Sequence, residues 1–256
     1  MSDPARVLYQ FPVSHFCEKT RWNLDAKGLA YSVKNLLPGL HQRTTRKLSG
    51  VRTVPMLVDR GKAVGDSAVI ALYLEQTYPA RPLLPVGEAE RARVLELEAW
   101  FGKQAGRAIR QWMYGELVRK RGAATTVFLE GYPASLRGMS WLFAPLFELG
   151  LRKQYRLDET GIARARATLD EVFDRLEKET DRDPARYLSG DALSIADIAA
   201  ASLIGPLVAP IGSPWASLRD NDEVPAPIRA LRASLSTRPG WAWIEARYRD
   251  DRRPRA

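Results

Sequence analysis

A serine and a cysteine, Ser14 and Cys17, stand three residues apart just after a short apolar run at residues 6–9. The run predicts a strand, and the helix-forming stretch 18–27, which stops at Gly28, predicts a helix directly after the pair. A strand that leads into a helix through a tight turn places the free N–H groups and positive end of the helix beside both side chains. Such a corner favours an anion, and a thiolate suits it best.

The same two residues also fit a purely structural role. Serine is among the preferred residues at a helix N-cap, and an isolated cysteine often behaves as a small buried hydrophobe. The chemical interpretation of Ser14 and Cys17 therefore depends on what else the chain provides.

A second segment, Thr53-Val54-Pro55-Met56, places a proline at the start of the strand predicted for residues 56–58. A cis Val54–Pro55 bond would turn the chain sharply and leave the backbone N–H and C=O of Val54 free to pair with an extended peptide. The alternative is an ordinary trans proline at the start of a strand.

A third segment, Gly65-Asp66-Ser67-Ala68, brings a carboxylate and a hydroxyl to the start of a predicted helix. Both groups could simply cap the helix. Alternatively, Ser67 and its backbone N–H would bind a ligand carboxylate at the helix N-terminus, while Asp66 binds the ligand's ammonium group.

These segments lie in an N-terminal region that alternates between strand-like and helix-like patterns. The predicted order is βαβαββα, an α/β layer structure over residues 1–80. A proline-rich linker follows at residues 81–88, and residues 89–256 show helical periodicity without a convincing strand. We therefore predict an α/β domain followed by an all-helical bundle domain, with the apolar segment 195–203 at the centre of the bundle.

Composition narrows the function class. With one cysteine and two histidines, the chain provides neither a disulfide framework nor a structural zinc site, and no metal is expected. The N-terminus lacks the pattern of a secretory signal, and no apolar run is long enough to span a bilayer, so we expect a cytoplasmic protein. The net charge of +9 is spread over both halves, which favours attraction of a small anion over nucleic-acid binding.

The order of the three segments resembles the N-terminal thioredoxin-like domain of the cytosolic glutathione transferases, in particular the classes with a catalytic Ser or Cys (theta, tau, zeta and omega). Further along the chain, Leu193-Ser194-Ile195-Ala196-Asp197-Ile198 is similar to the N-capping box and hydrophobic staple of that family. The resemblance covers roughly residues 1–120 and 160–250. It implies glutathione as co-substrate, a hydrophobic electrophile as second substrate, and a homodimer.

The resemblance also implies roles for individual residues. Ser14 falls at the catalytic position, and His41 falls where theta-like members place a histidine near the glycine end of glutathione. Val54, next to Pro55, would pair with the cysteinyl unit, and Asp66 and Ser67 would bind the γ-glutamyl unit. Three positions depart from the family pattern: Thr53 stands where a lysine is frequent, Asp66 where glutamate is commoner, and His15 where proline is frequent.

Three functions remain open from the sequence. In the first, Ser14 donates a hydrogen bond to the sulfur of glutathione, whose thiolate attacks the electrophile. In the second, Cys17 is the nucleophile of a thiol-transfer reaction, its pKa lowered by the first turn of the helix. The third is a protein of the same fold that binds glutathione without turnover, as a carrier or assembly module.

The segment 125–155 motivates that third function, because it is rich in large apolar residues and longer than the usual connection in the family. It could line the electrophile pocket, cover a dimer interface, lie on a membrane surface, or simply add to the bundle core; membrane association is not the leading expectation. The large apolar residues of the segment are Phe128, Tyr132, Trp141, Leu142, Phe143, Leu146, Phe147 and Leu149.

Overall fold

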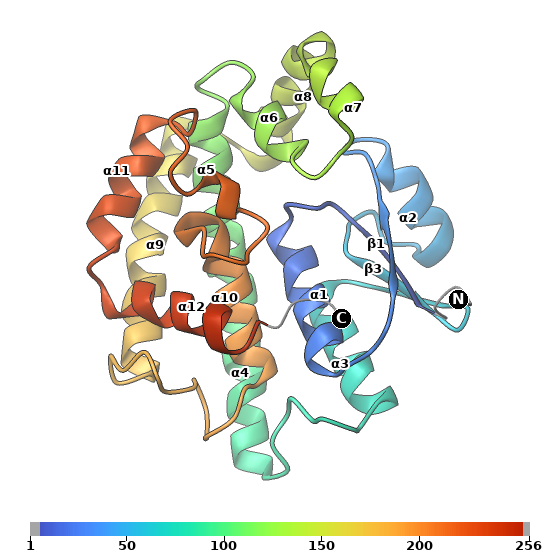
Figure 1. Cartoon of the computed structure of the whole chain (residues 1–256), viewed down its shortest axis with the longest axis vertical. Helices are drawn as coiled ribbons and strands as arrows, with labels where there is room; N and C mark the ends of the chain where they lie inside the picture. The colour runs from blue at the N-terminus through green and yellow to red at the C-terminus, as the bar shows by residue number, and fades with distance from the viewer. Residues whose placement is uncertain (1–5, 253–256) are drawn as a thin grey trace.

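The computed structural model describes residues 6–252, so the outer ends of the two predicted domains, residues 1–5 and 253–256, lie outside the described part. A small sheet with its helices lies beside a larger group of helices (Figure 1). The N-terminal part consists of β1 (Arg6–Gln10), α1 (His15–Ala26), β2 (Ser32–Asn35), α2 (His41–Ser49), β3 (Met56–Asp59), β4 (Lys62–Gly65) and α3 (Ser67–Thr77). This order confirms the predicted βαβαββα arrangement.

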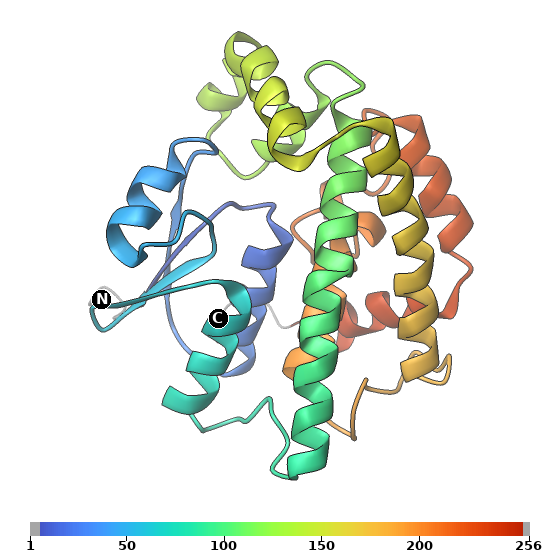
Figure 2. The ribbon, with the colours of Figure 1, turned by 180° about the vertical axis from the view of Figure 1, so that it is seen from behind.

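The four strands form one mixed sheet in the order β2-β1-β3-β4. β1 runs parallel to β2 and antiparallel to β3, which in turn is antiparallel to β4. Helices α1 and α3 lie between the sheet and the helical part, and α2 lies on the outer side (Figures 1 and 2). The core of this part is made of Leu8, Leu24, Tyr31, Leu57, Val64, Ile70 and Leu74.

One predicted boundary shifts in the structure. Helix α1 begins at His15, three residues before the predicted start, because Ser14 caps it. Strand β2 spans Ser32–Asn35, since only these four residues pair with β1.

The helical part follows without a strand among the described residues. Its elements are α4 (Glu88–Lys103), α5 (Ala105–Leu117), α6 (Ala123–Phe128), α7 (Ala134–Gly138), α8 (Ser140–Tyr155), α9 (Glu159–Glu179), α10 (Ile195–Val208), η1 (Ala216–Leu218), α11 (Ala226–Leu235) and α12 (Pro239–Asp250). Helices α6 to α8, which include most of the aromatic-rich segment, lie together at the top of the molecule in Figure 1.

Helix α10 is buried along its entire length, which confirms the prediction of a central helix. Its start is fixed by the predicted capping box. The Asp197 carboxylate accepts a hydrogen bond from the backbone N–H of Ser194 at 2.9 Å, and the Ser194 hydroxyl accepts one from the N–H of Asp197 at 3.4 Å. Two otherwise unpaired donors of the first turn are thereby satisfied inside the core.

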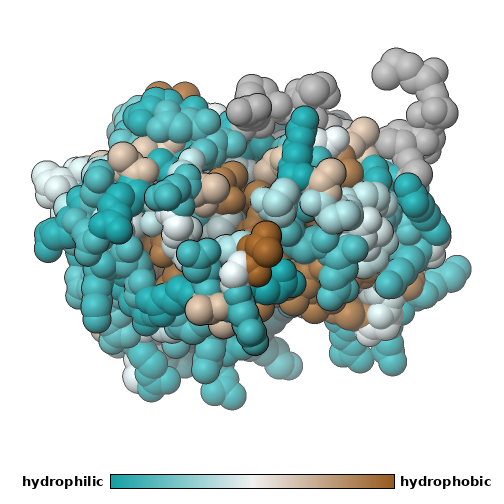
Figure 3. Space-filling view, turned by 90° about the horizontal axis from the view of Figure 1, so that it is seen from below, coloured by the Kyte–Doolittle hydropathy of each residue, from teal (hydrophilic) through white to brown (hydrophobic). Residues whose placement is uncertain are grey.

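The segment between α3 and α4 packs against the bundle. Leu83 and Leu84 are buried, and the carbonyl of Leu83 accepts a hydrogen bond from the N–H of Ile195 at 3.0 Å. Seen from below, this end of the molecule is mostly hydrophilic, with small apolar areas (Figure 3). Within residues 6–252, no helix combines the length and apolar character needed to cross a membrane.

Candidate functional site at the end of the sheet

The strand pairing brings the three sequence segments to one end of the sheet. Tyr9, near the end of β1, pairs with Met56 at the start of β3, and Met56 pairs with Gly65 at the end of β4. The loop that contains Ser14 therefore leaves the sheet beside Pro55, and Asp66 lies one strand further along the same end of the sheet. Because β2 runs parallel to β1, its end at Asn35 lies beside Gln10, and the chain leads from there to His41.

Ser14 occupies the N-cap of α1 with an extended backbone. Its hydroxyl oxygen accepts a hydrogen bond from the N–H of Cys17 at 3.4 Å, and its own N–H donates to the carbonyl of Phe11 at 3.2 Å. The side chain is half-buried. Accepting the bond from Cys17 does not use the hydroxyl hydrogen, so Ser14 can still donate to an anion at the positive end of α1.

Two side chains from outside the loop hold its backbone in place. The guanidinium of Arg21, on α1, donates to the carbonyl of Pro12 at 3.0 Å. The indole N–H of Trp215, between α10 and η1, donates to the carbonyl of Val13 at 2.9 Å. The position of the Ser14 hydroxyl therefore depends on both parts of the molecule.

Cys17 is completely buried, and burial raises the pKa of its thiol. The predicted lowering of this pKa by the first helical turn is therefore wrong. Desolvation disfavours the thiolate more strongly than Arg21 and the hydrogen bond with Ser14 favour it. Cys17 packs as a small hydrophobe one turn below the half-buried serine.

His15, which had no interpretation from the sequence, is buried against α5. Its pKa is lowered to about 3, mainly by burial and also by the nearby Arg110, while a hydrogen bond with the backbone of Gly106 acts in the opposite direction. The imidazole is therefore neutral at physiological pH. Its Nε2 has no hydrogen-bond partner within the described chain.

The Val54–Pro55 peptide bond is cis, which is one of the two alternatives that the sequence left open. Pro55 is buried, Val54 is half-buried and Thr53 is exposed. Within residues 6–252, no backbone hydrogen bond of Val54 is present in the sheet or in the connecting loops. Its N–H and C=O are therefore available to an extended peptide that lies along the end of the sheet.

Asp66 is the N-cap of α3. One of its carboxylate oxygens accepts hydrogen bonds from the N–H groups of Ala68 at 2.8 Å and Val69 at 3.3 Å, so the capping role is real. Asp66 is exposed, with a φ of 69°, whereas Ser67 is buried. A carboxylate that caps with one oxygen keeps the lone pairs of the other for a ligand cation.

His41, the first residue of α2, lies on the outer side of the site. Its ring meets the ring of Phe11 edge to face, with centroids 4.8 Å apart. Burial lowers its pKa, although the nearby carbonyls of Arg52 and Leu37 act in the opposite direction. Phe11 therefore contacts α2 through its ring and accepts the hydrogen bond from the N–H of Ser14 through its backbone carbonyl.

The structure shows contacts near the Ser14 loop that the sequence did not predict. Gly131, with a φ of 82°, approaches Pro12 so closely that a Cβ there would lie 2.7 Å from the proline side chain. The next residue, Tyr132, donates its hydroxyl to the carbonyl of Leu36, just after β2. These contacts join the aromatic-rich segment to the loop before Ser14. No local pattern predicts them, because they depend on the path of a long connection.

A second group surrounds Arg110 on α5. Its guanidinium lies over the ring of Phe16, 5.6 Å from the centroid, and over that of Tyr155 at 4.7 Å. The Tyr114 ring contacts those of Phe128 and Tyr155, with centroids 4.8 and 5.3 Å apart. Within the described residues, Arg110 forms no ion pair. A cation and several rings therefore lie close to the first turn of α1.

The aromatic-rich segment thus divides into three groups. Phe128 is buried and Phe147 is partly buried in the main core, Tyr132 contacts the sheet domain, and Trp141, Leu142, Leu146 and Leu149 are exposed. Across residues 6–252, no three His, Cys, Asp or Glu side chains are grouped as a metal site would require.

Comparisons with known proteins agree with this arrangement. The family model "Glutathione S-transferase, N-terminal domain" matches residues 8–82, and the model "Glutathione S-transferase, C-terminal domain" matches residues 159–233. Together they account for more than half of the chain, and they leave residues 83–158 unmatched.

Individual proteins give the same result. A maleylacetoacetate isomerase of Dictyostelium discoideum is 26% identical over 204 residues, which cover 77% of this chain and 77% of that protein. Glutathione S-transferase Z2 of Arabidopsis thaliana is 38% identical over 88 residues, 33% of this chain and 40% of that protein. A solved glutathione S-transferase from Rhodospirillum rubrum has a TM-score of 0.56 at 25% identity, covering 92% of this chain and 90% of that one.

The two domain matches, their order and the helical bundle that follows the four-stranded sheet lead to one conclusion. The chain belongs to the glutathione S-transferase family.

Proposed function

We propose that this protein binds glutathione across the end of the sheet and activates its thiol through the hydroxyl of Ser14. The observation that carries the proposal is the position of Ser14. This residue is half-buried at the N-terminus of α1, and its hydroxyl hydrogen is free to donate. Cys17, one turn further along the helix, is completely buried. The cysteinyl unit would pair with the backbone of Val54, and the γ-glutamyl unit would lie between Asp66 and Ser67.

The expected gain in acidity follows from simple magnitudes. A free thiol has a pKa of about 8.5, so only a few per cent is thiolate at neutral pH. A hydrogen bond to a charged group contributes about 1.5–3 kcal/mol, and one pKa unit corresponds to about 1.36 kcal/mol. One such bond would lower the thiol pKa by about one to two units, and the helix N-terminus adds about 0.3–1 kcal/mol. Thiolate would then be the main form at pH 7.

The activated thiolate would attack an electrophile bound on the side of α5. The rings of Phe16, Tyr114, Phe128 and Tyr155 favour an apolar or aromatic second substrate there. Arg110 supplies a positive charge that would attract a carbonyl or carboxylate oxygen of this substrate. We also propose a homodimer and a cytoplasmic location, both on the basis of family membership.

Replacement of Ser14 tests the proposal directly. Ser14→Ala should raise the pKa of glutathione in the complex by one to two units, measured by the ultraviolet absorbance of the thiolate as pH is varied. Glutathione affinity at high pH should change little, because the peptide and carboxylate contacts remain. Cys17→Ala serves as the control and should leave the thiol pKa unchanged. An unaltered thiol pKa in Ser14→Ala would reject the proposed role.

The thiol-transfer alternative is disfavoured by the buried, weakly acidic Cys17. It predicts a mixed disulfide between Cys17 and glutathione, which mass spectrometry would detect as a glutathione adduct after incubation with oxidised glutathione. The carrier alternative predicts glutathione binding without turnover of any electrophile in a broad panel.

A further inference from the structure

Helix α8 exposes large apolar side chains on the face that points away from the protein. Trp141 is 71% exposed, Leu142 58%, Leu146 75% and Leu149 62%. They follow one another at helical spacing and so form one continuous stripe. The opposite face is apolar as well: Ala144 and Leu151 are buried there. A helix that is apolar on both faces is normally buried on both.

Basic side chains accompany this stripe. Arg152 and Lys153 continue the exposed face at the end of α8, and Arg121 lies on the loop before α6. Residues 119–156 contain seven arginines and lysines but only two glutamates, Glu130 and Glu148. Residues 119–156 therefore carry a net charge of +5. Arg119 and Lys120 pair with Glu116 and Glu223 outside this range, which reduces the local excess to +3.

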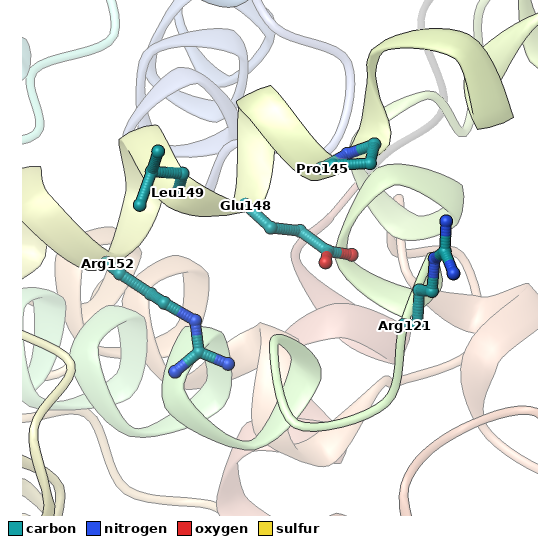
Figure 4. A pocket seen from close by; sticks show the side chains of 5 residues that line it. All are labelled: Arg121, Pro145, Glu148, Leu149 and Arg152. Atoms are coloured by element: carbon teal, nitrogen blue, oxygen red, sulfur yellow. The ribbon is translucent and has the colours of Figure 1, made fainter.

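A cavity of about 450 Å³ adjoins the stripe, and its lining includes both apolar and basic side chains. Pro145 and Leu149 form an apolar wall, and Arg121 and Arg152 stand at either side of Glu148 (Figure 4). One carboxylate oxygen of Glu148 accepts a hydrogen bond from the N–H of Gly122 at 2.8 Å, so this glutamate holds the loop that carries Arg121. One nitrogen of the Arg152 guanidinium donates to the carbonyl of Val118 at 2.7 Å. Its remaining N–H groups and the guanidinium of Arg121 could bind an anionic lipid headgroup while the lipid chain contacts Leu149 and Pro145.

We propose that α8 is an interfacial anchor that docks this protein on an anionic lipid bilayer. Trp141 and the leucines would enter the boundary between headgroups and acyl chains, and the flanking arginines and lysine would contact lipid phosphates. The helix would lie on the membrane surface, in keeping with its modest length of 16 residues.

The charges favour lipid over a second copy of the chain. Two copies joined through this face would bring two regions with an excess of positive charge together, which opposes association. An anionic lipid bilayer instead offers phosphate groups to the basic side chains and an apolar interior to the exposed stripe. The docking face is separate from the Ser14 corner, so the proposal does not depend on glutathione chemistry.

Co-sedimentation with lipid vesicles tests the proposal. The full chain should bind vesicles of phosphatidylserine and phosphatidylcholine and bind vesicles of pure phosphatidylcholine much more weakly. The double variant Leu146→Glu/Leu149→Glu should reduce binding to the anionic vesicles at least tenfold, because two inserted side chains become charged. The variant Val86→Glu is the matched control: Val86 is 98% exposed and lies in the segment between α3 and α4, so its binding should be unchanged.

A second variant separates the electrostatic contribution. Arg121→Gln/Lys153→Gln removes two exposed charges and should weaken binding about 25-fold, since each basic residue near an anionic surface contributes about fivefold. Circular dichroism would verify that each variant is folded. Equal binding by the leucine variant and the wild-type chain would overturn the proposal. So would an absence of vesicle binding together with reversible self-association in sedimentation velocity that Leu146→Glu abolishes.

Discussion

Ser14 and His15 are adjacent in the chain but lie in different environments. The serine is half-buried at the start of α1, where its hydroxyl can meet a ligand, whereas the histidine is buried against α5. The spacing of Ser14 and Cys17 predicts the helix N-terminus correctly, because capping is a local property of three or four residues. The burial of Cys17 and His15 depends on what packs against α1, and no local pattern contains that information.

The neutral, buried His15 gives the first prediction at the residue scale. Its folded-state pKa of about 3 lies below the unfolded value of 6.5, so the unfolded chain binds the proton more readily as pH falls below 6.5. His15 therefore contributes stability at neutral pH that is lost on acidification. Relative to His15→Gln, the wild-type chain should lose about 2 kcal/mol of unfolding free energy between pH 7 and pH 5.

Urea unfolding of both proteins at several pH values measures this difference. The comparison with the variant is essential, because burial raises the pKa of Asp197 to about 6, which acts with the opposite sign in the same range. A stability difference that does not vary with pH would mean that His15 has the same pKa in the folded and the unfolded chain.

At the scale of elements, the strand order explains why three distant segments form one site. The alternation of strand and helix patterns predicts the order of elements along the chain, since each element has its own periodicity, but it does not predict the order of the strands in the sheet. The contacts that fix the Ser14 loop are different in kind. Trp215 reaches Val13 across about two hundred residues, and Gly131 approaches Pro12 from a long connection, so neither contact follows from local sequence.

The indole of Trp215 should act as a positioning group for Ser14. Trp215→Phe leaves the carbonyl of Val13 without its donor, which should destabilise the protein by about 1–3 kcal/mol and let the loop move. If glutathione is activated as proposed, the thiol pKa of the complex should rise as the Ser14 hydroxyl is displaced, with a matching fall in kcat.

Trp243→Phe provides the control, because the indole of this buried residue also donates to a carbonyl, that of Arg186, at 2.7 Å. This variant should lose a comparable amount of stability and keep the thiol pKa. A rise of equal size in both variants would show that general destabilisation, and not the position of Ser14, determines the acidity.

At the scale of the whole molecule, the sheet part and the helical part share a packed boundary. Trp22 of α1 belongs to the same core cluster as Phe101 of α4 and the central helix α10. Within this boundary, Lys19 of α1 forms an ion pair with Glu98 of α4, and their side chains are only 1% and 8% exposed. A charged pair so placed stabilises the fold only while both partners are present.

This pair gives the last prediction. Glu98→Leu leaves the ammonium group of Lys19 buried without its partner and should lower the unfolding free energy by about 3–5 kcal/mol. The double variant Lys19→Met/Glu98→Leu removes both charges and keeps most of the packing, so it should recover nearly all of that loss. For comparison, Glu223→Gln interrupts the exposed pair with Lys120 and should change stability by less than about 1 kcal/mol. Because α1 packs against α10 and is joined to α4 by this ion pair, urea should unfold both parts in a single transition, followed by circular dichroism and tryptophan fluorescence. Separate transitions in the wild-type chain would contradict this coupling. A double variant as unstable as Glu98→Leu would show that the loss in the single variant does not come from leaving Lys19 buried without its partner.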